Sequence, residues 1–378
     1  MLLRADLNVP LWTTPAGTVE VADDFRIQAL LPTLSWLVER GAQVTVCSHL
    51  GRPKGRVVPE LSMGPVRRRL LELVPGVKVM ENLRFDPGEE ANDPAFVDRL
   101  VEGHDFYVND AFGSVHRAHA SIVGPPTRLP SVAGRLLVRE VAALSRLIEA
   151  PPRPFVAVVG GAKLGDKLGL LEALSEKVDT LLVGGGMCFT FLAALGHDVG
   201  SSLVDPEHLE ACHRLVRLGH HTVLPTDIVA LGPDGTLGPA RPLTGEVRHF
   251  GRDMPAGWRG VDIGPETVAT FAHEIERAAT VLWNGPMGVV EDERFAAGTR
   301  GVADALAQCP GFTVVGGGDT AAALDAWGLA DQIGHVSTGG GAMLELIEKG
   351  DLPGLAALRA GRPGGVQPPY GKRDPASK

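Results

Sequence analysis

Two lysines, Lys163 and Lys167, stand in the glycine-rich stretch VVGGAKLGDKLGLLEAL at residues 158–174. A Walker A loop needs Gly, four residues, Gly-Lys and then Ser or Thr. Here Gly160 and Gly165 have that spacing, but the second lysine comes one position late and a leucine replaces the hydroxyl residue. The stretch is a degenerate phosphate loop, a chance run of glycines, or a different way of holding a phosphate. The lysines are four residues apart, about one helical turn, so they could face one site.

Glycine clusters recur at the ends of predicted strands throughout the second half of the chain. Ligands of open parallel sheets bind beyond the carboxyl ends of the strands, where glycine lets the backbone approach and helix N-termini offer N–H groups to anions. Five such clusters in one half predict a site for a large polyanion such as a nucleotide. The clusters are GGAK (160–163), GGGM (184–187), WNGPMG (283–288), GGGD (316–319) and STGGGAMLE (337–345).

One of these clusters also fits a competing interpretation. Gly316, Gly318 and Ala321 match the GxGxxA fingerprint of dinucleotide-binding proteins, after a predicted strand and before a predicted helix. That fingerprint is accompanied by an acidic residue about 20 positions further on. Asp331 comes only 15 positions after Gly316. An NAD-linked oxidoreductase therefore stays open as the less favoured alternative, because it leaves the other clusters unexplained.

The first half of the chain carries cations beside glycine, asparagine and aspartate. Arginine binds phosphate and carboxylate groups through two parallel hydrogen bonds, so several arginines at one sheet edge would suit a ligand with both groups. Most of these residues follow predicted strands and would therefore meet at that edge. They are Asp6, Asn8, Arg26, His49, Arg52, Arg84, His116, Arg117 and His119.

The elements that must position these residues alternate regularly. Buried apolar runs between amphipathic stretches are typical of a parallel α/β sheet. The strands are predicted at 42–49, 77–81, 104–110, 153–161, 179–186, 221–227, 280–285 and 312–318. The helices are predicted at 26–41, 66–76, 169–178, 265–278 and 298–310.

The alternation restarts once, which predicts two doubly wound, mostly parallel α/β domains. A helical stretch at 137–150, before Pro151, would join them as a hinge helix. We expect an anion-binding domain at 1–150, including this helix, and a nucleotide-binding domain at 151–350. The segment 351–378 would return toward the first domain and end in a polar tail.

Composition narrows the class of protein. The net charge of −9 disfavours nucleic acid as a partner, although residues 1–150 balance 17 Lys and Arg against 18 Asp and Glu. The four cysteines form no CxxC pair, and His116 and His119 lack an obvious third zinc ligand. No apolar run approaches the ~18 residues of a membrane span, and the charged start MLLRADLNVP does not resemble a signal peptide. We expect a cytoplasmic protein that binds small molecules.

Taken together, these segments resemble phosphoglycerate kinases. They stand in that family's order between residues 4 and 345, and several are long and distinctive. The matching stretches are RADLNVP, SHLGRPKG, ENLRF, NDAFGSVHRAHAS, VVGGAKLGDK, GGGMCFTF, WNGPMGVVE, GGGDTAAA and STGGGAMLE. The lysine loop then resembles the family's own loop and need not be a failed Walker A motif.

The resemblance implies a role for each matching residue. Contacts to 3-phosphoglycerate would come from Asp6, Asn8, Arg26, His49, Leu50, Gly51, Arg52, Arg84 and Arg117. Contacts to ADP or ATP would come from Lys167, Gly260, Asn284, Glu291, Gly317, Gly318, Asp319 and Thr320, with Asp319 also holding Mg²⁺. The catalytic groups would be Arg26, Lys163, Lys167 and the backbone of Gly339, Gly340 and Gly341.

The implied reaction is reversible phosphoryl transfer between 1,3-bisphosphoglycerate and ADP, as in glycolysis and gluconeogenesis. Transfer would be direct and in line, in a cleft that closes between the domains of a monomer. The attacking group, a carboxylate or an ADP oxygen, is already nucleophilic and needs no general base. The protein must therefore supply positioning and positive charge. A binding-only relative that has lost turnover is the remaining alternative, disfavoured because no charged site residue is missing.

Overall fold

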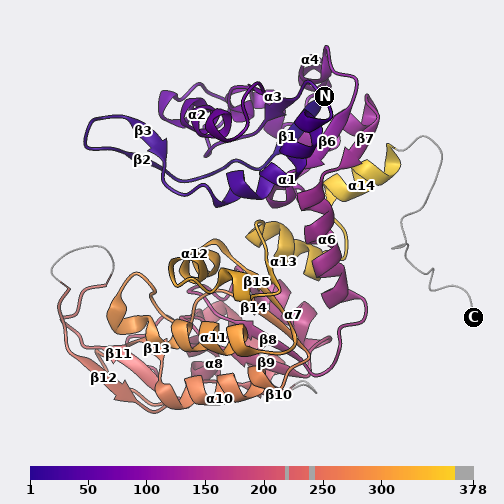
Figure 1. The fold of residues 1–378 in the computed structure, drawn as a ribbon. Helices are drawn as coiled ribbons and strands as arrows, with labels where there is room; N and C mark the ends of the chain where they lie inside the picture. The colour runs from indigo at the N-terminus through magenta and orange to yellow at the C-terminus, as the bar shows by residue number, and fades with distance from the viewer. Residues whose placement is uncertain (218–220, 238–242, 362–378) are drawn as a thin grey trace, which may run out of the picture. The chain divides into compact units, whose positions relative to one another are not determined.

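The computed structural model describes residues 1–217, 221–237 and 243–361 (Figure 1). The chain divides into two compact units. One contains Met1–Ala142 and the described residues from Asp351 onward, and the other is Ala143–Gly350. Each unit has its own sheet and its own apolar core.

The first unit is built on a five-stranded sheet in which all strands run parallel. Parallel strands are covered on both faces, which explains why β1 reads LLRA and is buried at every position. This sheet confirms the predicted fold class. The strand order is β5 (Lys78–Val79), β4 (Thr45–Cys47), β1 (Leu2–Ala5), β6 (Tyr107–Asp110) and β7 (Ser131–Ala133).

Amphipathic helices cover this sheet. Leu34 of α1 and Leu70 of α2 join Leu3 and Val46 of the strands in one buried cluster. The helices are α1 (Phe25–Glu39), α2 (Gly64–Leu73), α3 (Pro87–Glu90), α4 (Pro94–Val101), α5 (Ala120–Val123) and α14 (Pro353–Ala360). The 3₁₀ turns are η1 (Pro59–Leu61), η2 (Leu83–Phe85), η3 (Phe112–Ser114) and η4 (Pro125–Thr127).

A short antiparallel hairpin in the first unit was not predicted. It consists of β2 (Leu11–Thr13) and β3 (Val19–Val21). Three residues per strand are too few for a recognisable alternation of apolar and polar positions. Arg68 of α2 donates a hydrogen bond to the carbonyl of Val19 at 2.6 Å, which ties the hairpin to that helix.

The second unit contains a six-stranded parallel sheet. Its central strand β14 reads TVLWN and is buried throughout, and Trp283 lies fully inside the core. This sheet also confirms the predicted class. The strand order is β10 (His221–Val223), β9 (Thr180–Val183), β8 (Phe155–Val159), β14 (Thr280–Asn284), β15 (Phe312–Gly316) and β16 (His335–Val336).

Helices follow almost every strand of this second sheet, and Figure 1 shows α10 and α11 side by side. They are α7 (Leu168–Ser175), α8 (Cys188–Ala194), α9 (Leu209–Val216), α10 (Pro265–Glu276), α11 (Ala297–Gln308), α12 (Gly318–Ala326) and α13 (Gly340–Lys349). The 3₁₀ turns are η5 (Pro206–His208), η6 (Glu293–Phe295) and η7 (Ala330–Gln332). Among the described residues, no helix is long and apolar enough to cross a membrane.

A three-stranded antiparallel sheet adds to the second unit. It is ordered β12 (Val247–Phe250), β11 (Ile228–Leu231) and β13 (Arg259–Ile263), and the sequence did not predict it. The single strand predicted at 221–227 ends early, at Val223, because Pro225 cannot donate a ladder hydrogen bond. The chain then turns and begins β11.

Helix α6 (Arg135–Ile148) occupies most of the predicted hinge segment, and the division between the units falls inside it. Side chains of the first unit cap its first turn. Thr33 Oγ1 accepts a hydrogen bond from the Arg135 amide at 3.0 Å, and Asp110 Oδ1 accepts one from the Leu137 amide at 3.0 Å. After Gly350, helix α14 packs against α5 of the first unit. The predicted polar tail beyond residue 361 lies outside the described residues.

Candidate active site

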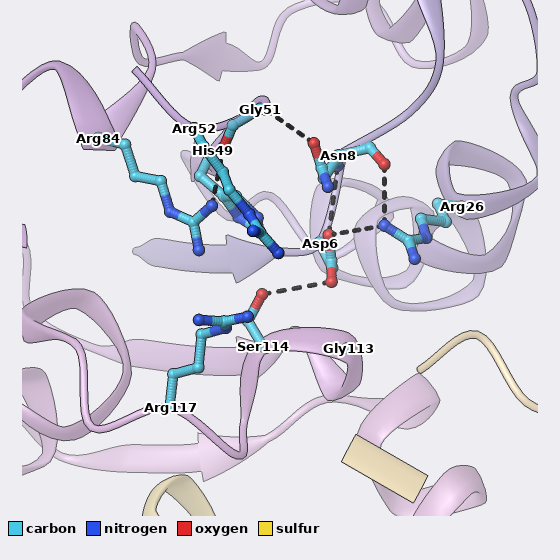
Figure 2. Close-up of a pocket in the computed structure, with 10 residues that line it drawn as sticks. All are labelled: Asp6, Asn8, Arg26, His49, Gly51, Arg52, Arg84, Gly113, Ser114 and Arg117. Atoms are coloured by element: carbon cyan, nitrogen blue, oxygen red, sulfur yellow. Dashed lines mark hydrogen bonds and ion pairs between the residues drawn. The ribbon is translucent and has the colours of Figure 1, made fainter. Parts of the chain in front are cut away.

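A polar pocket opens at the carboxyl edge of the first sheet (Figure 2). Eight of the nine residues predicted to contact an acid substrate line it. The ninth, Leu50, is buried, and its backbone exchanges hydrogen bonds with the Asn82 side chain at 3.2 and 2.7 Å. The lining residues are Asp6, Asn8, Arg26, His49, Gly51, Arg52, Arg84, Gly113, Ser114 and Arg117.

Strand ends deliver most of these residues to the pocket. Asp6 follows β1, His49 follows β4, Arg84 lies in η2 after β5, and Ser114 lies in η3 after β6. Because all these strands are parallel, their carboxyl ends meet at one edge, as the sequence predicted. Arg26 instead comes from the first turn of α1.

Asp6 is the acidic centre of the pocket. Figure 2 shows its carboxylate between Arg26, at 3.4 Å, and the Ser114 hydroxyl, at 3.2 Å. Burial alone would raise the pKa of Asp6, but the charges of Arg26 and Arg4 and the hydrogen bond from the Asn8 amide outweigh burial and bring the pKa down to about 2. Asp6 therefore stays ionised and orients Arg26, whose Nη1 also donates to the Asn8 carbonyl at 2.8 Å.

Arg84 is the most enclosed of the four pocket arginines. Its side chain is 5% exposed, its Nη1 donates to the Gly51 carbonyl at 2.8 Å, and its Nε lies 3.2 Å from Glu90. Burial lowers the pKa of Arg84, with Glu90 opposing this effect. A guanidinium remains charged after such a shift. Four arginines facing one aspartate leave the pocket with excess positive charge, which suits a phosphate and a carboxylate.

Gly51 is needed for the turn that presents His49 and Arg52. Its φ is +61°, which side chains rarely tolerate, and a Cβ there would lie 2.8 Å from Leu61. The Gly51 amide donates to Asn8 Oδ1 at 2.8 Å. This hydrogen bond joins the loop after β4 to the loop after β1 and fixes the shape of the pocket.

In the second unit, Lys167 is held at the carboxyl edge of the sheet. Its ammonium donates to both the carbonyl and the side-chain oxygen of Asn284. Burial lowers the pKa of Lys167 to about 8, although Asp319 and Asp166 favour its charged form. Glycines make this packing possible, because a Cβ on Gly285 would lie 2.4 Å from the Gly160 carbonyl oxygen.

The helical spacing from which we expected Lys163 and Lys167 to face one site is not present, so their sharing a site stays a prediction. Helix α7 begins at Leu168 with Lys167 as its N-cap, so Lys163 lies in the preceding turn and is exposed. The Gly165-Asp166 pair disfavours helix there, because glycine loses most conformational freedom in a helix. The Lys167 amide instead donates to the Leu164 carbonyl at 2.8 Å, closing a turn.

Two helix N-termini meet near Lys167 and Asn284. Helix α12 is capped by Gly317, and a Cβ on Gly317 would lie 3.5 Å from the Asn284 amide nitrogen. Helix α13 is capped by Gly339, and a Cβ on Gly340 would lie 3.3 Å from Gly317. Adjacent helix N-termini beside a lysine form a place for an anion.

The remaining predicted nucleotide residues differ in position. Asp319 is exposed in the first turn of α12, whereas Thr320 is buried and accepts a hydrogen bond from the Gly285 amide at 3.2 Å. Thr320 thus supports the glycine turn. Gly260 lies in β13 against Phe189, and Glu291 is exposed on the loop before η6.

A two-unit α/β protein with an arginine-lined pocket on one sheet and a lysine-and-glycine edge on the other is a phosphate-handling protein. The phosphoglycerate kinase family model matches residues 1–80 and 75–350. The phosphoglycerate kinase of Salinispora tropica is 51% identical and that of Roseiflexus castenholzii is 47% identical. These alignments cover 95% and 94% of this chain and 96% and 95% of those proteins. The chain belongs to the phosphoglycerate kinase family.

Solved structures agree with this family. The phosphoglycerate kinase of Coxiella burnetii is 38% identical with a TM-score of 0.81, over 94% of this chain and 95% of that one. The enzyme of Pyrococcus horikoshii is 30% identical with a TM-score of 0.83, over 95% and 96%. Family membership replaces the dinucleotide-binding interpretation of Gly316, Gly318 and Ala321, although these residues do join β15 to α12 as that fingerprint requires.

Proposed function

We propose that the chain catalyses reversible phosphoryl transfer between 1,3-bisphosphoglycerate and ADP, giving 3-phosphoglycerate and ATP. The observation that supports this most is the convergence of Arg26, Arg52, Arg84 and Arg117 in one pocket of a chain that belongs to this family. We further propose that it acts as a cytoplasmic monomer in glycolysis and gluconeogenesis.

The first unit would bind the acid substrate. A phosphate and a carboxylate both accept paired hydrogen bonds from guanidinium groups, and the pocket offers four of them. His49, Asn8 and the backbone of Gly51 would add neutral contacts. Asp6 would act through Arg26, since its carboxylate already holds that side chain.

The second unit would bind the nucleotide. Lys167, Asn284 and the N-termini of α12 and α13 form the anion-binding part, with Gly260 and Glu291 as further contacts. Asp319 is an exposed carboxylate on the same helix N-terminus, which fits Mg²⁺, because this ion is usually bound by one or two carboxylates plus phosphate oxygens. When bound, Mg²⁺ would neutralise phosphate charge.

For phosphoryl transfer, the protein would have to position the two substrates and place positive charge around the transferring group. A carboxylate or an ADP oxygen is already nucleophilic, so direct in-line transfer needs neither a general base nor a phosphoenzyme. Arg26, Lys163, Lys167 and the amides of Gly339 to Gly341 would surround the transferring group. Direct transfer requires the two bound substrates to meet, so the proposal includes closure of the units about α6.

A coupled assay tests this function. The purified chain is incubated with ATP, Mg²⁺ and 3-phosphoglycerate, and glyceraldehyde-phosphate dehydrogenase reports the acyl phosphate through NADH oxidation. We expect oxidation that depends on all three components. A folded chain that binds nucleotide but gives no oxidation would favour the binding-only alternative instead.

A further inference from the structure

A buried polar network lies beside the pocket but does not line it. Arg4 of β1 is 1% exposed and Glu89 of α3 is fully buried, although both are charged residue types. Charged side chains are almost never fully buried unless they are paired. Their surroundings therefore call for an explanation beyond packing.

Ser121 connects these two charged groups. Its hydroxyl donates to Glu89 Oε1 at 2.6 Å and, having only one proton, accepts from Arg4 Nε at 2.8 Å. Its amide donates to Glu89 Oε2 at 2.9 Å, and its carbonyl accepts from the Tyr107 hydroxyl at 2.7 Å. Ser121 is thus fixed through its amide, its carbonyl and its hydroxyl, and it holds Arg4 in one orientation.

The other end of Arg4 reaches a pocket residue. Arg4 Nη2 lies 3.2 Å from His49 Nδ1. A guanidinium can only donate, so Nδ1 must be the bare nitrogen of the ring and Nε2 must carry the proton. His49 lines the pocket, and among the described residues Nε2 has no hydrogen-bond partner. The protonated nitrogen is therefore the one available to a ligand.

We propose that Arg4, oriented by Ser121 and Glu89, is a positioning residue that fixes His49 as the Nε2–H tautomer, so that His49 donates a hydrogen bond to the bound acid substrate. The part about the substrate rests on the proposed function. With the other tautomer, the lone pair of Nε2 would face an anion and repel it.

The charges around His49 agree with a neutral ring. Burial and the charges of Arg4, Arg84 and Arg26 lower its pKa well below the ordinary value, and the charge of Asp6 opposes them. A second histidine nearby does not alter this arrangement. His119 Nδ1 lies 3.9 Å from Glu89, but burial lowers the pKa of His119 to about 4, so its ring is also neutral at pH 7.

Nitrogen NMR of the free protein tests the tautomer without any assay of activity. In protein labelled with ¹⁵N-histidine, His49→Gln identifies the His49 signals by their loss. We expect the Nε2–H pattern, unchanged from pH 5 to pH 8. A cationic ring or an Nδ1–H pattern would overturn the proposal, whether or not the chain is an active kinase.

Two variants test the network. Arg4→Lys keeps the charge, but a single ammonium cannot serve Ser121 and His49 together. Ser121→Ala removes the connecting hydroxyl, and it carries the test alone if Arg4→Lys does not fold. Both should give mixed His49 tautomers. Ser131→Ala is the matched control, because Ser131 is also buried in this unit and its hydroxyl donates to the nearby Leu129 carbonyl, at 2.8 Å, outside this network.

Kinetics then separate positioning from general destabilisation. Losing one oriented hydrogen bond should raise KM for 3-phosphoglycerate about fivefold to tenfold, with KM for ATP nearly unchanged. In a His49→Ala background, Arg4→Lys should raise KM no further, because Arg4 acts through His49. Additive effects would overturn the positioning role. A wild-type chain without kinase activity would remove the proposed function and leave the NMR result to decide the tautomer.

Discussion

At the residue scale, a few hydrogen bonds orient the arginine side chains of the pocket in the first unit. Arg26 is held by Asp6 and by the Asn8 carbonyl, yet its side chain remains 30% exposed. A guanidinium that is held through Nη1 and still partly exposed is suited to meeting a phosphoryl group whose charge is spread over three oxygens.

Replacing Arg26 tests whether it acts in the transition state. Arg26→Ala should lower kcat by about two orders of magnitude or more, since removing a preorganised donor has effects of this size. Arg128→Ala is the control, because Arg128 is exposed in the same unit and pairs only with surface groups. Steady-state kinetics of both variants give the answer, and full activity of Arg26→Ala would remove Arg26 from the mechanism.

The sequence predicted eight of the residues that line this pocket, because residue type and strand order carry the signal. Three of the four arginines follow strands of the sheet, and parallel strands bring their ends together. Ser114 was not singled out as a contact, since a small hydroxyl residue in a loop has no distinguishing pattern. The helical spacing assumed for Lys163 and Lys167 was wrong, because the helix starts only at Leu168 and Lys163 lies before it.

At the element scale, the glycine turns of the second unit let three loops approach each other. A Cβ on Gly285, whose φ is +90°, would clash with both the Gly160 carbonyl and the Lys167 ammonium, and the Gly161 amide donates to the Pro286 carbonyl at 2.8 Å. From the glycine clusters we predicted close approach of the backbone to a ligand. We did not predict that the glycines also let these loops pack on one another.

Gly285→Ala should therefore displace the lysine loop. A Cβ would lie 2.5 Å from Lys167 Nζ, so we expect at least a tenfold fall in kcat/KM for ATP and a lower Tm. Gly328→Ala is the matched control, because Gly328 also has positive φ, +67°, but no atom of the described part of the chain lies within 4 Å of its Cβ position. Equal losses in both variants would show that backbone strain, and not the close approach, is responsible.

Helix α6 gives a prediction about pH at the same scale. Asp110 caps this helix through Oδ1, whereas its Oδ2 is buried with no hydrogen-bond partner among the residues that the structure describes. Burial raises the pKa of Asp110 to about 6. A carboxyl group whose folded pKa is raised disfavours the folded state once it ionises. The contribution of Asp110 to the free energy of unfolding is therefore greatest below about pH 4. It falls by at most about 3 kcal/mol as the pH rises to about 6.

Asp110→Asn should flatten the dependence of folding stability on pH between 4 and 6. Burial also raises the pKa of Asp262, to about 7, and this residue acts in the same direction in the wild type and in the variant. The quantity to measure is therefore the difference in stability between the two proteins at each pH. Denaturant unfolding at several pH values gives it. Asp98→Asn, an exposed change in the same unit, should leave the slope intact. An unchanged slope in Asp110→Asn would contradict the assignment.

At the scale of the whole molecule, the chain is two α/β units that each bury a core and each carry one part of the proposed site. Alternating strands and helices predicted both parallel sheets. The antiparallel sheet β12–β11–β13 was missed because its strands are only four or five residues long, and the strand predicted at 221–227 ends just before β11 begins.

If each unit binds one substrate, each ligand alone should protect its own set of loops from hydrogen exchange, because ligand binding suppresses local opening near the site. 3-Phosphoglycerate should slow exchange in segments 6–8, 49–52, 82–86 and 113–117, and Mg-ADP in segments 160–167, 284–291 and 317–320. Hydrogen exchange measured by mass spectrometry on the full chain, with each ligand separately, makes the comparison. Protection of the arginine pocket by Mg-ADP alone, with none at the lysine loop, would mean that the proposed division of substrates between the two units is wrong.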